Sequence, residues 1–168
     1  MNYKNFKNFY FINKAVGAES LMPFFSLNKI FQKEFSKLLK KNNFDGLSSF
    51  LKDNLTNRFE NYENFDPSKH ISIETLLSCN VLKEIKINLK NKAYNFIKKI
   101  DLLQIDAEGY DDIIIFNCNL DILKPALINF EHKNLSSSKR LKLNKYLQSK
   151  NYNSLIYSRS DTLAIKQY

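Results

Sequence analysis

The sequence predicts an α/β protein with a largely parallel sheet, and three observations support this prediction. Two apolar runs of strand length, residues 100–105 and 126–130, each end in polar residues. Segments with apolar residues at helical spacing lie before, between and after these runs. Two short C-terminal runs are joined by a turn at residues 158–161, as in a hairpin. Strands that alternate with helices form parallel sheets, and the hairpin adds an antiparallel edge.

The first half of the chain predicts strands and helices in alternation. Apolar residues at 9–12 indicate a strand over residues 8–16, and Gly17 then marks a turn. Residues 21–27 favour a second strand, in which Pro23 is typical of a sheet edge. Phe31 and Phe35 recur at helical spacing, so we expect a helix over residues 28–41. The next expected elements are a short helix and a loop at 48–62, a turn at 66–68, a strand at 71–73 and a helical turn at 74–79.

The second half predicts a more regular alternation. An apolar stripe from Leu82 to Ile97 indicates a helix that faces the core. The strand at 100–105 is followed by a helix from residue 111, and the strand at 126–130 by an amphipathic helix over 136–150. The strands at 153–157 and 162–165 close the chain.

The amino-acid composition limits the classes of protein to which this chain can belong. The 168 residues are 43% hydrophobic and 14% aromatic, which fits one folded domain over residues 1–168. No apolar run is long enough to span a bilayer, and residues 1–10 lack the apolar core of a signal peptide, so we expect a cytoplasmic protein. Cys79 and Cys118 do not make a disulfide framework.

The net charge of +9 allows a nucleic-acid partner, but the basic residues are spread along the chain and not interleaved with aromatic residues in one element. We therefore do not expect nucleic acid as the partner, and a basic nucleic-acid-binding module is kept only as an alternative.

The candidate site residues follow the two central strands. Asp106 and Glu108 come directly after the first strand, and Gly109 allows a sharp turn. Glu131 and His132 come after the second strand, and we expect them beside Asp106 because ligands bind at the carboxyl ends of parallel strands. A carboxylate or the imidazole can act as a base for an acceptor hydroxyl. The carboxylates can alternatively cap the helix near residue 110 or hold Mg²⁺, but nothing else indicates a metal, and we expect none.

Three segments carry a resemblance to a known family. Residues 100–111, IDLLQIDAEGYD, resemble the motif IDLLKIDVEGYE of the FkbM family of S-adenosylmethionine-dependent methyltransferases. Residues 124–131, KPALINFE, are similar to the family's strand kP-x-ii-x-fE, and residues 13–17, NKAVG, to its segment N-x-Aig. The resemblance runs from about residue 13 to the C-terminus.

The resemblance implies a partial Rossmann-like class I methyltransferase sheet. The family's sheet order is 3-2-1-4-5-7-6, and this chain resembles strands three to seven, without the glycine-rich cofactor loop of the first strand. The implied domain is therefore truncated at its N-terminus. Its sheet edge is exposed, so we expect a homodimer or a partner chain that covers this edge.

The implied activity is O-methylation of a hydroxyl on a sugar, a lipid or a secondary metabolite, with S-adenosylmethionine as cofactor. By the same resemblance, Asn13, Ala15, Asp106 and Gly109 border the cofactor. The acceptor, a small molecule or a glycan, is then chosen by the variable region of helices and loops at residues 28–99. A non-catalytic remnant, or the partner subunit of a split methyltransferase, is the alternative.

Overall fold

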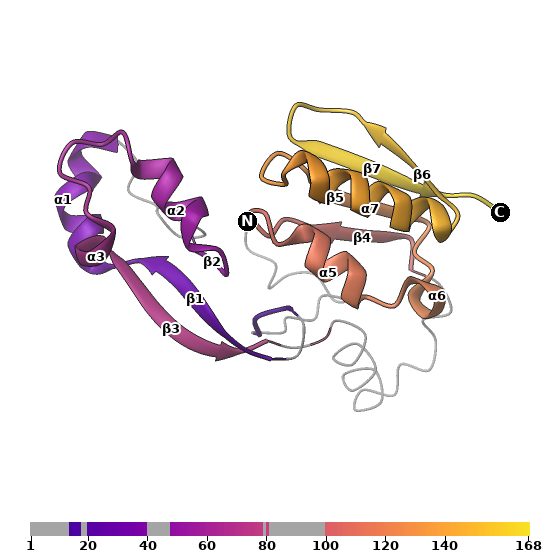
Figure 1. The fold of residues 1–168 in the computed structure, drawn as a ribbon, viewed down its shortest axis with the longest axis horizontal. Helices are drawn as coiled ribbons and strands as arrows, with labels where there is room; N and C mark the ends of the chain where they lie inside the picture. The colour runs from indigo at the N-terminus through magenta and orange to yellow at the C-terminus, as the bar shows by residue number, and fades with distance from the viewer. Residues whose placement is uncertain (1–13, 18–19, 40–47, 79, 81–99) are drawn as a thin grey trace, which may run out of the picture.

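The computed structural model describes residues 14–17, 20–39, 48–78, 80 and 100–168. These residues form two sheets with helices packed on them, which confirms the α/β class (Figure 1). None of the helices in this part of the chain has the length and apolar character needed to cross a bilayer.

The first sheet is antiparallel and has the order β2-β1-β3. β1 pairs with β3 along its whole length, whereas β2 pairs only with Phe25 and Ser26. Three helices lie around the end of this sheet where β1 ends and β3 begins (Figure 1). The elements are β1 (Leu21–Leu27), α1 (Lys29–Leu39), β2 (Ser48–Ser49), α2 (Lys52–Phe59), α3 (Pro67–His70) and β3 (Ile71–Leu77).

An aromatic cluster holds these helices against the first sheet. Phe31 and Phe35 are one turn apart on α1, and their rings stack with centroids 4.6 Å apart. Phe31 also meets Phe59 of α2 edge to face, at 4.8 Å. His70 is fully buried beside them; its Nδ1 accepts a hydrogen bond from the Asp66 backbone N–H, and its Nε2 lies 3.0 Å from Glu34 Oε2. His70 is thus part of the packing of this cluster.

The second sheet has four strands in the order β4-β5-β7-β6. β4 and β5 are parallel, and β7 runs antiparallel to both of its neighbours. The C-terminal strands therefore form the expected hairpin, with β7 inserted beside β5 and β6 at the outer edge. The elements are β4 (Leu102–Ile105), α5 (Asp111–Asn117), α6 (Leu120–Leu123), β5 (Leu127–Glu131), α7 (Ser137–Ser149), β6 (Tyr152–Ile156) and β7 (Asp161–Lys166).

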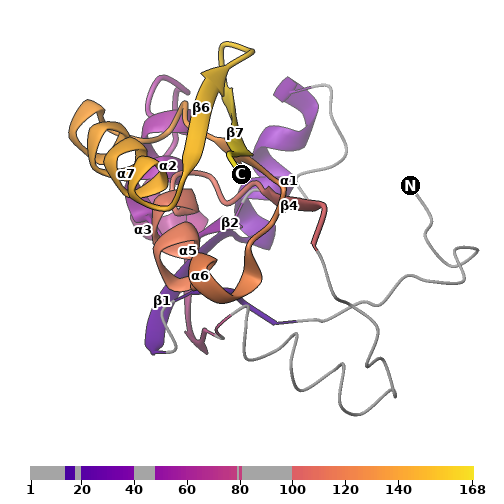
Figure 2. The same cartoon turned by 90° about the vertical axis from the view of Figure 1, so that its right-hand side faces the viewer.

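The helices α5 and α7 lie on the same face of this second sheet (Figure 2). Ile128 and Phe130 of β5 point to this face and are buried together with Ile115 of α5 and Leu143 of α7. Side chains alternate between the two faces of a strand, so the intervening Asn129 and Glu131 belong to the opposite face. The main core of the molecule is therefore the layer between the second sheet and these two helices.

Two expectations for the first half are wrong. Residues 74–77 belong to β3 and not to a helical turn. The local sequence is compatible with a strand or with a helical turn. Pairing with β1, about 50 residues earlier in the chain, makes it a strand. β1 and β3 are also antiparallel and form their own sheet, so they do not extend the parallel one.

Pro23 lies in the central strand of its sheet, and not in an edge strand. At this position, however, β1 is paired only with β3, because β2 reaches no further than Phe25. Pro23 has no backbone N–H to donate, and no described strand pairs with β1 on the side opposite β3 at this position. Pro23 therefore lies at a local sheet edge, where proline is tolerated. The strand expected over residues 8–16 and the helix expected between Leu82 and Ile97 lie, wholly or largely, outside the described residues.

Candidate functional site

A tight turn connects β4 to α5 and begins the site. Its two central residues, Glu108 and Gly109, have φ angles of +46° and +88°. The N–H of Tyr110 closes the turn on the carbonyl of Ala107 at 3.1 Å. A Cβ atom on Gly109 would lie 3.1 Å from the Asn134 carbonyl oxygen and from the Asn54 side chain. Gly109 is therefore required by both its backbone conformation and its close neighbours.

Asp111 fixes the carboxyl ends of β4 and β5 to each other. Its side chain is fully buried at the start of α5. Its two carboxylate oxygens accept hydrogen bonds from the backbone N–H groups of Glu131, at 3.1 Å, and Gly109, at 3.3 Å. Burial raises the pKa of Asp111 to about 6, although these two N–H groups act to lower it. This carboxylate is positioned by the fold and, in turn, positions the two loops that carry the other acids.

The Asn134 amide joins the carboxylates of the two strand ends. Its Nδ2 lies 2.7 Å from Glu131 Oε2 and 2.9 Å from Glu108 Oε2, so one amide group donates to both acids. Glu108 also forms an ion pair with Arg58 of α2, with 3.4 Å between Nη1 and Oε1. Glu108 and Glu131 therefore lie close together at this edge of the sheet.

This end of the sheet carries a surplus of negative charge. Burial raises the pKa of Glu131, and the negative charges of Glu108 and Asp106 raise it further, against the hydrogen bond from Asn134. The Arg58 side chain, the cation paired with Glu108, is half exposed, so water weakens its effect. We call Asp106, Glu108, Asp111 and Glu131 the acidic rim. The acidic rim favours a positively charged ligand over an anionic one.

A cavity of about 600 Å³ opens between the carboxyl end of β4, the start of α5 and the first sheet. Its volume lies within the range of small-molecule sites. Asp106 lines it at the carboxyl end of β4, and Ala15 lines it from the N-terminal segment, whereas Glu108, Asp111 and Glu131 of the acidic rim do not line it. The remaining lining residues are mostly apolar or aromatic: Val16, Phe24, Phe50, Leu76, Leu103, Ile105, Ala107, Tyr110 and Ile114, with Lys14, Ser48, Ser49 and Gln104.

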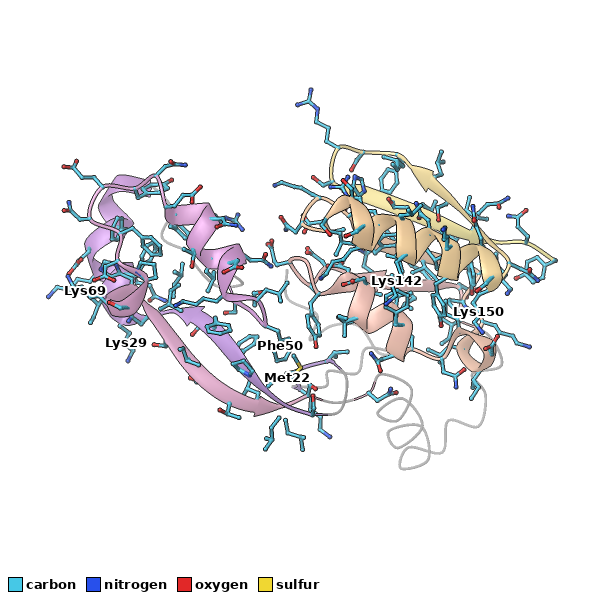
Figure 3. The ribbon with its side chains drawn as sticks, viewed as in Figure 1. Met22, Lys29, Phe50, Lys69, Lys142 and Lys150 are labelled. Carbon is cyan, nitrogen blue, oxygen red and sulfur yellow. The ribbon has the colours of Figure 1, made fainter. Side chains whose placement is uncertain are left out.

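Aromatic rings form one wall of this cavity. The Phe50 ring lies 5.2 Å from that of Phe24 and 5.0 Å from that of Tyr110. The Tyr110 hydroxyl reaches Met22 Sδ at 3.0 Å, which ties α5 to β1. Figure 3 shows Met22 and Phe50 on the side of the first sheet that faces the second sheet. This wall offers flat apolar surfaces against which a planar ring can stack.

The other expected site residues have different positions. Asn13 lies outside the described residues. Gly109 shapes the turn and does not line the cavity. His132 follows Glu131 but points to the opposite face of β5, because side chains alternate along a strand. There it is buried, its Nδ1 lies 2.9 Å from Thr162 Oγ1, and it lines a separate cavity of about 110 Å³ between α7 and β6.

Sequence reasoning missed three residues of this site. Asp111 lies within the motif at residues 100–111, and its place before an apolar run indicates the start of a helix, but burial of its charge has no local signal. Asn134 lies in a loop three residues after Glu131, and Arg58 is 50 residues from Glu108. Only the folded chain brings these side chains to the carboxylates.

Within the described residues, no group of three or more histidine, cysteine, aspartate or glutamate side chains is arranged to hold a metal ion. Comparisons of the chain with models of protein families, with curated proteins and with solved structures found no match.

Proposed function

We propose that the chain binds S-adenosylmethionine at the carboxyl ends of β4 and β5 and acts as an O-methyltransferase. The acceptor would be a hydroxyl group of a sugar, a lipid or a secondary metabolite. The observation that carries the proposal is the cavity of about 600 Å³ next to the acidic rim. The order β4-β5-β7-β6 with an antiparallel β7 also agrees with half of the sheet order implied by the resemblance to the FkbM family.

The residues present fit this cofactor in two respects. Its sulfonium and amino groups are positive, and the acidic rim supplies carboxylates. Its adenine is planar and apolar on both faces, and the wall of Phe24, Phe50 and Tyr110 suits such a ring. Asp106 and Ala15 are the residues that we assign to hold the cofactor, because both line the cavity.

The chain's own residues would supply alignment and a proton acceptor. The bound cofactor supplies a methyl group on a positively charged sulfur. Alignment of the acceptor hydroxyl with that group contributes most of the rate enhancement, and the rigid turn at Glu108 and Gly109 supports it. Glu131 is our candidate for the base that takes the hydroxyl proton, since its raised pKa makes the carboxylate a better proton acceptor.

Calorimetric titration of the full chain with S-adenosylmethionine tests the proposal. We expect micromolar binding that weakens about tenfold or more in Asp106→Asn, which corresponds to about 1.4 kcal/mol. Asp53→Asn is the matched control, because Asp53 is an exposed carboxylate on α2 that does not line the cavity. No binding up to about 1 mM cofactor would overturn the proposal for the isolated chain.

A partner subunit of a split methyltransferase is the second candidate. Among the described strands, β4 is paired on one side only, and Leu102 on it is 51% exposed. Open strand edges are normally covered in native proteins. This candidate predicts that the isolated chain binds the cofactor but transfers no methyl group, which a radiolabelled methyl-transfer assay over a panel of hydroxyl acceptors measures directly.

A further inference from the structure

The strand β6 forms the outer edge of the second sheet on the side away from β4. Residues Tyr152–Ile156 pair with β7, and no other described strand pairs with β6 (Figure 1). The pairing advances one residue at a time from Tyr152 opposite Lys166 to Ile156 opposite Thr162, so it contains no bulge. Within the described part of the chain, this edge has no partner strand, and no bulge turns it away from another strand.

The hydrogen-bond pattern identifies the backbone groups that point outward. Just beyond β6, the Gln167 N–H donates to the Asn151 carbonyl at 2.8 Å. In an antiparallel pair, hydrogen-bonded and non-hydrogen-bonded residues alternate. The residues at 153 and 155 therefore bond to β7, whereas Tyr152, Ser154 and Ile156 direct their N–H and C=O groups to the free edge.

This edge lacks the usual protection against association. Natural edge strands are protected by charged residues, proline or bulges. Residues 152–157, YNSLIY, contain no charged residue and no proline, although 26% of the chain is charged. Leu155, Ile156 and Tyr157 are 55%, 64% and 54% exposed. Two copies of a chain with a net charge of +9 repel each other, and an uncharged edge is where they can meet with little repulsion.

We propose that β6 is a self-association surface at which two copies pair their β6 strands antiparallel across a two-fold axis. The second sheet then continues through the interface into its copy. The pattern of free groups fixes the register. Ser154 faces Ser154 of the second copy, and Tyr152 faces Ile156, because only this pairing uses the outward groups of all three residues. This proposal does not depend on the ligand of the cavity.

Sedimentation of the full chain between about 1 and about 100 µM tests the proposal. We expect a dimer at the high end that dissociates on dilution. Ser154→Pro removes the central outward N–H and leaves the inward bonds to β7, as proline does at edge positions. Leu155→Lys places like charges on the two paired strands. Both variants should be monomers throughout, whereas Leu141→Lys, on α7 at a similarly exposed site, should dimerise like the wild type.

Circular dichroism shows whether each variant is folded. If the β6 variants do not fold, hydrogen exchange of the wild-type chain decides: the amides of Tyr152, Ser154 and Ile156 should exchange at least about tenfold more slowly at the highest concentration than at the lowest. A wild-type monomer at about 100 µM, a dimer unchanged in folded Ser154→Pro and Leu155→Lys, or equal exchange at all concentrations would each overturn the proposal.

Discussion

At the residue scale, Asp111 is the most strongly perturbed carboxylate of the site. It is fully buried, and burial raises its pKa from 3.8 to about 6. The charged form is tolerated because the N–H groups of Glu131 and Gly109 donate to it. The same residue therefore ties two strand ends together and makes the stability of the protein depend on pH.

The free energy of unfolding should decrease between about pH 4 and pH 6 because of Asp111. The folded protein holds the proton more tightly than the unfolded chain, so this contribution is complete below the unfolded pKa of 3.8 and is lost as the pH rises through about 6. The loss is on the order of 3 kcal/mol. Urea denaturation at several pH values gives the free energy of unfolding of the wild type and of Asp111→Asn. The loss is the difference between the two proteins in how this free energy changes from about pH 4 to about pH 6. Parallel profiles would contradict the burial of a titrating Asp111.

Asn134 links Glu108 and Glu131 through one amide group. In Asn134→Ala, the pKa of Glu131 should rise further, because its hydrogen bond with Asn134 opposes the effects of burial and of the neighbouring charges. Carbon NMR of the side-chain carboxyl groups during a pH titration measures this shift. An unchanged or lowered pKa of Glu131 would show that Asn134 does not stabilise its charged form.

At the scale of elements, the turn between β4 and α5 places the acidic rim. Gly109→Ala should destabilise the fold by about 1–3 kcal/mol, because a side chain is strained at φ +88° and its Cβ meets the Asn134 backbone. Asn119→Gly is a matched control at another left-handed residue, and it removes a side chain, so its effect should be below about 1 kcal/mol. Thermal unfolding compares the two. Equal stability of Gly109→Ala and the wild type would mean that the turn can adopt another conformation.

A comparison of expected and observed helices and strands shows which parts of the structure can be predicted from the sequence. The strands at β4 and β5, helix α7 and the closing hairpin were all predicted within two residues, because each is an apolar or amphipathic run bounded by turn residues. β3 extends to Leu77 because it pairs with β1, which no local pattern reveals. Helix α6 was missed, since a single turn between Asn119 and Lys124, both left-handed, has too few residues for a periodic signal.

The site was predictable to the extent that strand topology controls it. Two parallel strands bring their carboxyl ends together, and this predicts that Glu131 and His132 lie beside Asp106; in the structure the charge of Asp106 acts on Glu131. His132 does not lie there, because the alternation of side chains along β5 directs it to Thr162. Arg58 reaches Glu108 only because the fold brings α2 near the turn between β4 and α5, and no local pattern in the sequence predicts that arrangement.

At the scale of the whole molecule, charge is distributed unevenly. The chain carries a net charge of +9, and yet the carboxyl ends of β4 and β5 gather four carboxylates beside an apolar cavity. A positively charged ligand would gain from this local charge even though the protein as a whole is basic. The acidic rim should select such a ligand, and S-adenosylmethionine differs from S-adenosylhomocysteine by one methyl group and the positive charge that this group gives the sulfur.

The most direct test compares the affinities of these two ligands for the wild type and for the double variant Glu108→Gln, Glu131→Gln. We expect the wild type to bind the sulfonium ligand about tenfold or more tightly than the thioether, and the ratio to fall toward one in the double variant. Glu60→Gln with Glu63→Gln, two exposed glutamates away from the cavity, should leave the ratio unchanged. A ratio that is the same in the wild type and in the Glu108 and Glu131 double variant would contradict the role of the acidic rim.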